Sequence, residues 1–460
     1  MERLTPLSAA FLQAEDEDPT TSMPIGSTAI FEGPAPTHEE FVEHLRGRLA
    51  LVPRYRQVVR QLPLDLGAPV WVDHPETDLD WHIRRTAVPA PGGRAELHRL
   101  IGRVMGSRMD RSRPLWEYWV VEGLEGGRWA VIQKVHHCVL DGVSGTELYQ
   151  VVFDTSATPR APVPDDWQPR PVPSTLGLTA TAVRDLALFP IVAGRSVLGL
   201  VLSPRDLAKQ AAVTARGSLG LLARVRPAAS TSLYGPLGKQ RRYTSVTVSL
   251  DDIKTVRKAA GCTVNDVALA VIAGGFRALL LSRGEEPHER AVRTLVPVNV
   301  RVPGEEGIVD NRVSMMLPRL PVDLEDPLER VATVRQRIGD AVGHGEPIAA
   351  TTLTTLGVHE PFLPVALGVR LAFRVPQRHL VTVTTNVPGP RKPIYALGRE
   401  CEVVLPYVPI ADRIRIGIAM FSYTDRFTFG ITGDYDTAPD IGVLAAAIGE
   451  AMDELLAAVG

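Results

Sequence analysis

Two adjacent histidines followed by an aspartate and a glycine are the residues of this chain best suited to chemistry. The run is His136-His137-Cys-Val-Leu-Asp141-Gly142, or HHxxxDG. A neutral imidazole can accept a proton near pH 7, so it can activate a hydroxyl as a general base. Asp141 is better placed to fix local structure than to act as a second base, and Gly142 permits a close backbone approach.

The elements around this motif would aim it into a cleft. Residues 129–135 are rich in β-forming types and run into the histidines, and Ser144-Gly-Thr-Glu147 is a capping-box pattern that would open a helix. Adjacent strand residues point to opposite faces, so both histidines cannot enter one cleft while the strand persists. A buried histidine is often only a core residue, but this spacing after a strand favours catalysis. Divergent rings without a third ligand nearby argue against a metal site.

The first third of the chain alternates helix and strand. Thr37-His-Glu-Glu40 is a capping box before an apolar helical face, and apolar spacing predicts a second helix over 94–108. Two β-rich runs, 116–121 and 129–135, are separated by glycines and predict a hairpin.

The composition changes after this region. Residues 157–174 carry six prolines, which indicates an extended connector, and alanine-rich helical sequence follows. A strand is expected from Tyr243. We therefore predict an N-terminal domain over 1–156 that carries HHxxxDG, a connector over 157–240, and a second α/β domain over 241–460.

The bulk numbers agree with a two-domain globular protein. The chain has 460 residues, of which 45% are hydrophobic and 22% charged. A net charge of −2 provides no long-range field for wrapping nucleic acid. Three scattered cysteines fit a reducing compartment, and no apolar leader opens the chain, so a cytoplasmic protein is expected. Segment 186–202 is apolar but contains Pro190 and Arg195, which argues against a spanning helix and leaves shallow interfacial contact open.

Further blocks along the chain resemble the bacterial wax ester synthase/diacylglycerol acyltransferase family. HHxxxDG alone is shared with the larger CoA-dependent acyltransferase superfamily, which includes chloramphenicol acetyltransferase and condensation domains of peptide synthetases. The narrower resemblance rests on blocks in family order: Leu4–Leu12, Trp81–Arg85, Pro114–Glu117, Thr263–Val267, Val296–Arg301, Thr385–Pro390, Ser422-Tyr423 and Asp434–Asp436. Departures at Tyr234, Arg415–Ile418 and Asp425 do not touch the histidines.

The resemblance implies a fold and a set of roles. The fold would be two chloramphenicol-acetyltransferase-like α/β domains with mixed sheets flanked by helices, and an active-site tunnel between them. His137 would be the general base, His136 its support, and Asp141 a structural residue paired with an arginine. Residues matching the family's other motifs would bind substrate or support the site: Gly142, Pro114, Leu115, Trp116, Asn265, Asp266 and Asn386.

Alternatives to these roles stay open. Pro114-Leu-Trp116 could be wall rather than substrate contact, and Asn265-Asp266 could simply cap the following helix. Asn386 could belong to a proline-fixed turn or donate to a developing oxyanion.

The implied activity is O-acyl transfer from acyl-CoA, as co-substrate, to diacylglycerol or a long-chain fatty alcohol. No bound cofactor or metal is expected. Both lipids favour a peripheral membrane or lipid-droplet location, with 178–228 as the candidate contact surface. The alternatives are a same-superfamily acyltransferase acting on a polyketide or another lipid alcohol, and a catalytically silent lipid-binding protein. The oligomeric state is not indicated.

Overall fold

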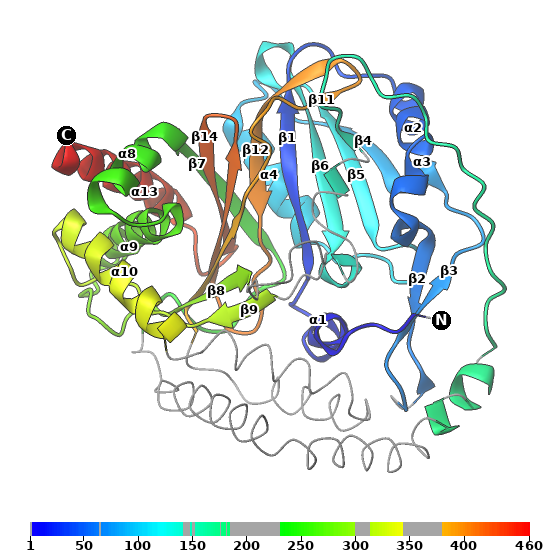
Figure 1. Ribbon diagram of the computed structural model, residues 1–460, viewed down its shortest axis with the longest axis horizontal. Coiled ribbons are helices and arrows are strands. Elements are labelled where there is room, and N and C mark those ends of the chain that lie inside the picture. Colours follow the sequence, from blue (N-terminus) through cyan, green and yellow to red (C-terminus); the bar gives the residue numbers. More distant parts are fainter. Residues whose placement is uncertain are drawn as a thin grey trace.

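The computed structural model describes residues 2–63, 66–140, 148–149, 152–174, 176–180, 182–184, 231–299, 313–343 and 380–460. Within these ranges the chain forms two six-stranded sheets and a small two-stranded one (Figure 1). Both large sheets contain parallel and antiparallel pairs, as the sequence predicts. The small sheet pairs β2 (Gln57–Arg60) with β3 (Val70–Asp73).

The first sheet has the order β11-β12-β1-β6-β5-β4. Its strands are β1 (Pro24–Phe31), β4 (Ile83–Ala87), β5 (Trp116–Glu122), β6 (Trp129–His136), β11 (Tyr395–Ala396) and β12 (Arg399–Tyr407). The predicted hairpin is confirmed, because β5 and β6 pair antiparallel. Every residue of β6 is buried. Alternate side chains of this strand enter different core clusters on the two faces of the sheet, one of which includes helix α4 (Arg94–Gly106).

The second sheet has the order β7-β14-β13-β10-β8-β9. Its strands are β7 (Arg241–Ser249), β8 (Thr294–Asn299), β9 (Val313–Met316), β10 (Thr382–Val387), β13 (Ile416–Tyr423) and β14 (Arg426–Asp434). Helices gather on its outer side (Figure 1): α8 (Leu250–Ala260), α9 (Val264–Ser282), α10 (Pro327–Gly343) and α13 (Ile441–Val459).

Sheet membership does not follow chain order. Strand β12 lies between β10 and β13 in the sequence but pairs with β1 of the first sheet. Contacts also cross between the sheets: the Tyr243 hydroxyl of β7 donates to the Pro406 carbonyl of β12 at 2.8 Å, and His98 Nε2 of α4 lies 3.0 Å from Ser245 Oγ. The division of the chain at residues 156 and 240 stays a prediction about folding units, whereas the sheets themselves interlock.

Local signals account for most of the helices. Thr37 and Glu40 form the predicted capping box at the start of α2 (His38–Arg46). The apolar spacing over 94–108 corresponds to α4. Helix α1 (Pro6–Glu17) starts at an N-cap threonine, Thr5, followed by Pro6. Short α3 spans Leu79–His82.

Helix α9 is long and apolar enough to cross a membrane by length and hydropathy, but most of it is buried inside the protein. It packs in the hydrophobic core between the second sheet and its helices, and Gly275 allows close approach to Leu444 and Ile448 of α13. We therefore assign α9 as a core helix.

Candidate active site

The hairpin of the first sheet brings the two histidines to the end of β6. The strand stops at His136, and a 3-10 turn, η5 (His137–Leu140), begins at the next residue. The His136 N–H donates to the Leu115 carbonyl at 3.0 Å, and the His137 N–H donates to the Met23 carbonyl at 3.0 Å. The change of backbone conformation between the two residues lets their rings occupy different surroundings.

The His137 side chain remains partly exposed. Its ring lies against the ring of Phe11, with 3.9 Å between centroids and 33° between planes. Burial, with a smaller contribution from the neighbouring His136, lowers the pKa of His137 to about 4. The ring is therefore unprotonated at neutral pH, which is the form that a general base needs.

His136, by contrast, is 1% exposed. Its Nδ1 accepts the Cys138 N–H at 3.2 Å and lies 3.0 Å from the Cys138 sulfur. Its Nε2 lies 3.4 Å from Oε1 of Glu15, at ion-pair distance. A fully enclosed ring suits support better than contact with substrate, and that role stays a prediction.

Part of the motif lies outside the described residues. These are Asp141, Gly142 and the capping-box pattern Ser144–Glu147. The predicted pairing of Asp141 with an arginine therefore stays a prediction.

The Pro114-Leu115-Trp116 block adjoins the histidines because β5 starts where β6 ends. All three residues are buried. The Trp116 ring stacks between Tyr55 and His82, at centroid distances of 4.6 and 4.2 Å, and its Nε1 donates to the Tyr55 carbonyl at 2.9 Å. Such full enclosure favours a wall beneath the site for Trp116.

Two asparagines from distant parts of the chain meet in the second half. Asn386 Nδ2 of β10 donates to Asn265 Oδ1 of α9 at 3.4 Å, and both residues are partly exposed. Asp266, the next residue, instead completes a capping box: its carboxylate accepts the Thr263 N–H at 2.9 Å, and the Thr263 hydroxyl accepts the Asp266 N–H at 3.1 Å. Asp266 therefore takes part in the cap of α9. Asn265 instead contacts Asn386, another predicted site residue.

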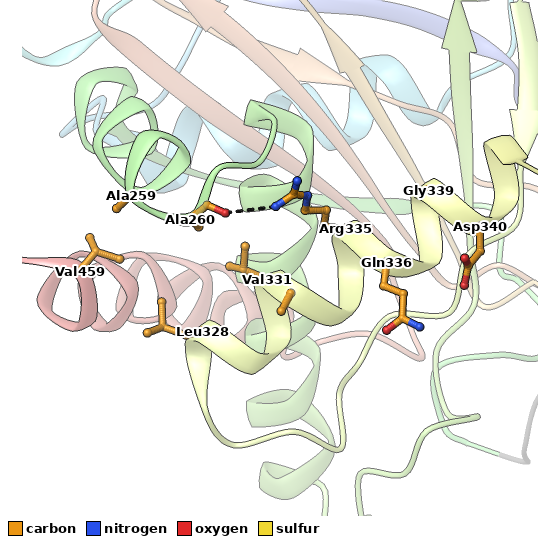
Figure 2. A pocket seen from close by; sticks show the side chains of 10 residues that line it. Ala259, Ala260, Leu328, Val331, Arg335, Gln336, Gly339, Asp340 and Val459 are labelled. Carbon is orange, nitrogen blue, oxygen red and sulfur yellow. Dashed lines mark hydrogen bonds between the residues drawn. The ribbon is translucent and has the colours of Figure 1, made fainter.

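A metal site and a surface groove are the other candidates for a functional site. Among the described residues, no cluster of three or more His, Cys, Asp or Glu side chains could hold a metal ion. Figure 2 shows a surface groove between α8, α10 and α13, lined by residues that include Ala260, Val331 and Arg335. No predicted site residue within the described ranges lines this groove, so the groove is separate from the two histidines.

Sequence reasoning missed two residues that touch the histidines. Phe11 lies within the Leu4–Leu12 block but was given no role, and Glu15 follows just beyond it. Their spacing of four residues was the available signal, because it places both side chains on one helical face.

Family models and curated relatives match most of the chain. Residues 4–268 match the family model of the wax ester synthase/diacylglycerol acyltransferase catalytic domain, and residues 309–456 match the C-terminal domain of the same family. Among curated relatives, the probable diacylglycerol O-acyltransferase tgs1 of Mycobacterium tuberculosis is 42% identical over 99% of this chain and 96% of its own length. The putative diacylglycerol O-acyltransferase Rv3371 of that species is 34% identical over 97% and 89%.

Solved structures share the fold. The wax ester synthase/diacylglycerol acyltransferase from Marinobacter aquaeolei VT8 superimposes with a TM-score of 0.70 at 24% identity, covering 100% of both chains. A starter condensation domain of rhizomide synthetase, in complex with C8-CoA, reaches 0.59 at 14% identity, covering 100% of this chain and 94% of its own. The predicted fold class is thereby confirmed, and the chain belongs to the wax ester synthase/diacylglycerol acyltransferase family.

Proposed function

We propose that this acyltransferase moves a long-chain acyl group from acyl-CoA to the hydroxyl of diacylglycerol or of a long-chain fatty alcohol, with His137 as the general base. The observation that carries the proposal is a partly exposed, unprotonated His137 directly after β6 in a chain of this family. The names of the curated relatives support diacylglycerol as one acceptor. A condensation domain of the same fold binds C8-CoA, which supports acyl-CoA as donor.

The chemistry would run in one ternary complex. His137 takes the proton from the hydroxyl as its oxygen attacks the thioester carbonyl, and a tetrahedral oxyanion forms. The carbon–sulfur bond then breaks, and the imidazolium returns the proton to the CoA thiolate. No acyl-enzyme is needed, because the thioester is already activated. A pKa of about 4 makes the resting ring a weak base, but negative charge developing next to it raises its basicity in the transition state.

Purified enzyme supplied with palmitoyl-CoA and either dioleoylglycerol or hexadecanol tests this proposal. CoA release is followed with a thiol reagent, and the ester is identified by mass. We expect His137→Ala to lower kcat about 1000-fold at an unchanged melting temperature. Near-native turnover by folded His137→Ala would refute the base assignment. CoA release only with a polyketide or another lipid alcohol would favour the first alternative, and no release at all would favour a silent lipid-binding protein.

We also propose peripheral contact with a lipid surface through the connector. Within its described part, residues 176–180 and 182–184 are helical. Leu178 and Ala182 pack against the cluster around β2 and β3, whereas Leu176 is 83% exposed and Val183 50% exposed. These two exposed side chains are seven positions apart, the spacing that places side chains on one face of a helix. The rest of the predicted surface, 178–228, lies largely outside the described residues.

Flotation with vesicles of phosphatidylcholine and dioleoylglycerol tests the contact. Leu176→Asp and Val183→Asp should reduce the bound fraction severalfold. Leu281→Asp is the matched control, since Leu281 is 53% exposed on α9 of the other half. Equal recovery of all three variants would rule this surface out.

A further inference from the structure

Helix α1 presses one face against the histidine motif. Phe11 and Glu15 are four residues apart and so project from the same side of the helix. The Phe11 ring covers the His137 ring at 3.9 Å between centroids. Glu15 places Oε1 3.4 Å from Nε2 of His136. One turn of one helix therefore contacts both histidines.

Glu15 is a buried carboxylate, 2% exposed. Burial raises the pKa of Glu15, but His136, Arg111 and the Met23 N–H outweigh burial and lower it to about 2. The Met23 N–H donates to Oε1 at 2.7 Å, and Arg111 donates to Oε2 at 2.9 Å. Glu15 is consequently ionised across the whole working pH range.

The contacts of His136 fix the tautomer of its neutral ring. Because Nδ1 accepts the Cys138 N–H, Nδ1 must carry a lone pair, and the proton of the neutral ring belongs on Nε2. Nε2 faces the Glu15 carboxylate. Among the described residues Nε2 has no partner with full hydrogen-bond geometry, so the contact with Glu15 is mainly electrostatic at 3.4 Å.

A second path runs from Glu15 to His137 through one peptide. The N–H of Met23 donates to the Glu15 carboxylate, and the carbonyl of Met23 accepts the His137 N–H at 3.0 Å. The carboxylate thus holds the backbone of His137 as well as the ring of His136.

We propose that Glu15 is a positioning residue that sets the orientation of both histidines, through the ring of His136 and through the Met23 peptide. This inference rests on the proposed role of His137 as base. Glu15 itself would not touch substrate. A carboxylate behind a functional histidine fixes its tautomer and ring plane, and loss of such a partner typically costs about 10- to 100-fold.

Arg111 offers a way to separate this role from general stabilisation of the helix. Its guanidinium also pairs with Asp16, at 2.6 Å. Asp16 is the neighbour of Glu15, is 43% exposed, and contacts Arg111 and Gln61 rather than either histidine. Asp16→Asn therefore removes one carboxylate from the same arginine and leaves His136 untouched.

The first experiment compares Glu15→Gln with Asp16→Asn in the palmitoyl-CoA assay. We expect Glu15→Gln to lower kcat about 10- to 100-fold with KM for palmitoyl-CoA within about twofold, and Asp16→Asn to leave both near wild type. Glu15→Asp keeps the charge but withdraws it by one methylene, so its kcat should be intermediate. Wild-type kcat in either Glu15 variant would overturn the proposal.

The second experiment repeats Glu15→Gln in a His136→Ala background. If Glu15 acts mainly through His136, its effect on kcat should shrink to about threefold or less there, which is the part carried by Met23. The same fold-loss in both backgrounds would show that Glu15 does not act through the ring of His136, and it would overturn the proposal. Failure of the proposed base is recognised separately, because His137→Ala would then remain active whatever the Glu15 variants do.

Discussion

The two large sheets have the same number of strands but bury different chemistry. The first sheet encloses Lys134, Glu117 and His136, each at most 5% exposed. In the second sheet, the buried polar side chains are mostly hydroxyls, such as Thr294 and Thr384, whose Oγ1 atoms lie 2.9 Å apart. Its charged exception is the Arg241–Asp434 pair at the ends of β7 and β14. Hydroxyls are satisfied locally at small cost, whereas charges are expensive to bury.

This difference suggests a division of labour. Ionisable groups enclosed around a strand end are typical of functional sites, where pKa values must be tuned. The first sheet would thus supply the groups that react. The second sheet and its helices would line the site and add the amides of Asn265 and Asn386. The halves are also distinguishable in experiments, because all six tryptophans precede residue 168: Trp71, Trp81, Trp116, Trp119, Trp129 and Trp167.

Acid should produce the largest contrast between the halves. Burial lowers the pKa of His44, His82, His98 and His137 from 6.5 to about 4 each, and all four lie in the first half. Between these pH values the unfolded chain binds more protons than the folded one. Stability is therefore full above about pH 6.5 and falls as pH drops towards 4. At about 1.4 kcal/mol per pKa unit, four such groups rival the net stability of a domain.

Tryptophan fluorescence and hydrogen exchange between pH 7 and 4 measure this effect. We expect tryptophan exposure and loss of protection in β5 and β6 at a pH where α9 and α13 remain protected. Loss of protection in both halves at the same pH midpoint would contradict the expected difference in acid stability. It would mean that the interlocked β12 makes the two sheets unfold as a single unit.

Removal of one buried charge should give the next largest effect. Lys134 Nζ donates to Ser107 Oγ at 3.0 Å and lies 3.8 Å from Glu117 Oε2, and burial lowers the pKa of Lys134 to about 8. Lys134→Met leaves Glu117 buried, with Arg84 at 3.9 Å as its nearest remaining cation among the described residues and the Trp119 Nε1–H donating to Oε2 at 2.9 Å. We expect a loss of about 3–5 kcal/mol in the free energy of unfolding, measured with urea.

The matched change in the second sheet is Thr384→Val, which removes a neutral hydroxyl contact and should cost about 1 kcal/mol. The double variant Lys134→Met/Glu117→Gln should be more stable than Lys134→Met alone, since no unpaired charge remains. Equal losses for Lys134→Met and Thr384→Val would show that the two sheets bury polar groups at similar cost.

The sequence predicted what depends on neighbouring residues. The hairpin of β5 and β6 follows from two β-rich runs around glycines, and the capping box at Thr37 follows from a four-residue pattern. The family blocks indicated the fold. The roles of Asp141 and Gly142 stay predictions.

Contacts between distant segments were beyond the sequence. The residue pattern of Arg399–Tyr407 predicts a strand but does not indicate its partner, which is β1 of the first sheet and not a strand of the second sheet. The meeting of Asn265 with Asn386 depends on how α9 packs beside β10. Glu15 was overlooked because its partner, His136, lies on a strand 121 residues later, and a carboxylate near a helix end is ordinarily solvated.

Asn386 tests whether the second half contributes any chemical group. Its Nδ2 carries two N–H donors, of which one points to Asn265 Oδ1. If the other meets the developing oxyanion, Asn386→Ala should lower kcat about 100-fold with little change in KM. The acyl-transfer assay measures this directly, with Asn386→Asp as the variant that keeps size and removes the donors. A loss of kcat below about threefold in both variants would show that Asn386 gives no hydrogen bond to the oxyanion.

The smallest expected effect comes from the capping-box carboxylates of two helices, one in each half. Asp266 closes the capping box of α9 and is 4% exposed, while Glu40 closes the equivalent box of α2 in the first half at the surface. Each replacement by alanine should cost about 1 kcal/mol of stability or less, with the larger loss at Asp266, whose removal leaves the Thr263 N–H without its partner in a drier setting. Neither should change kcat by more than about twofold once the folded fraction is equal. A large fall in kcat for Asp266→Ala at unchanged melting temperature would contradict the capping role, because a helix cap acts on folding and not on the transition state. It would place a second ionisable group of the active site in the half that otherwise buries hydroxyls.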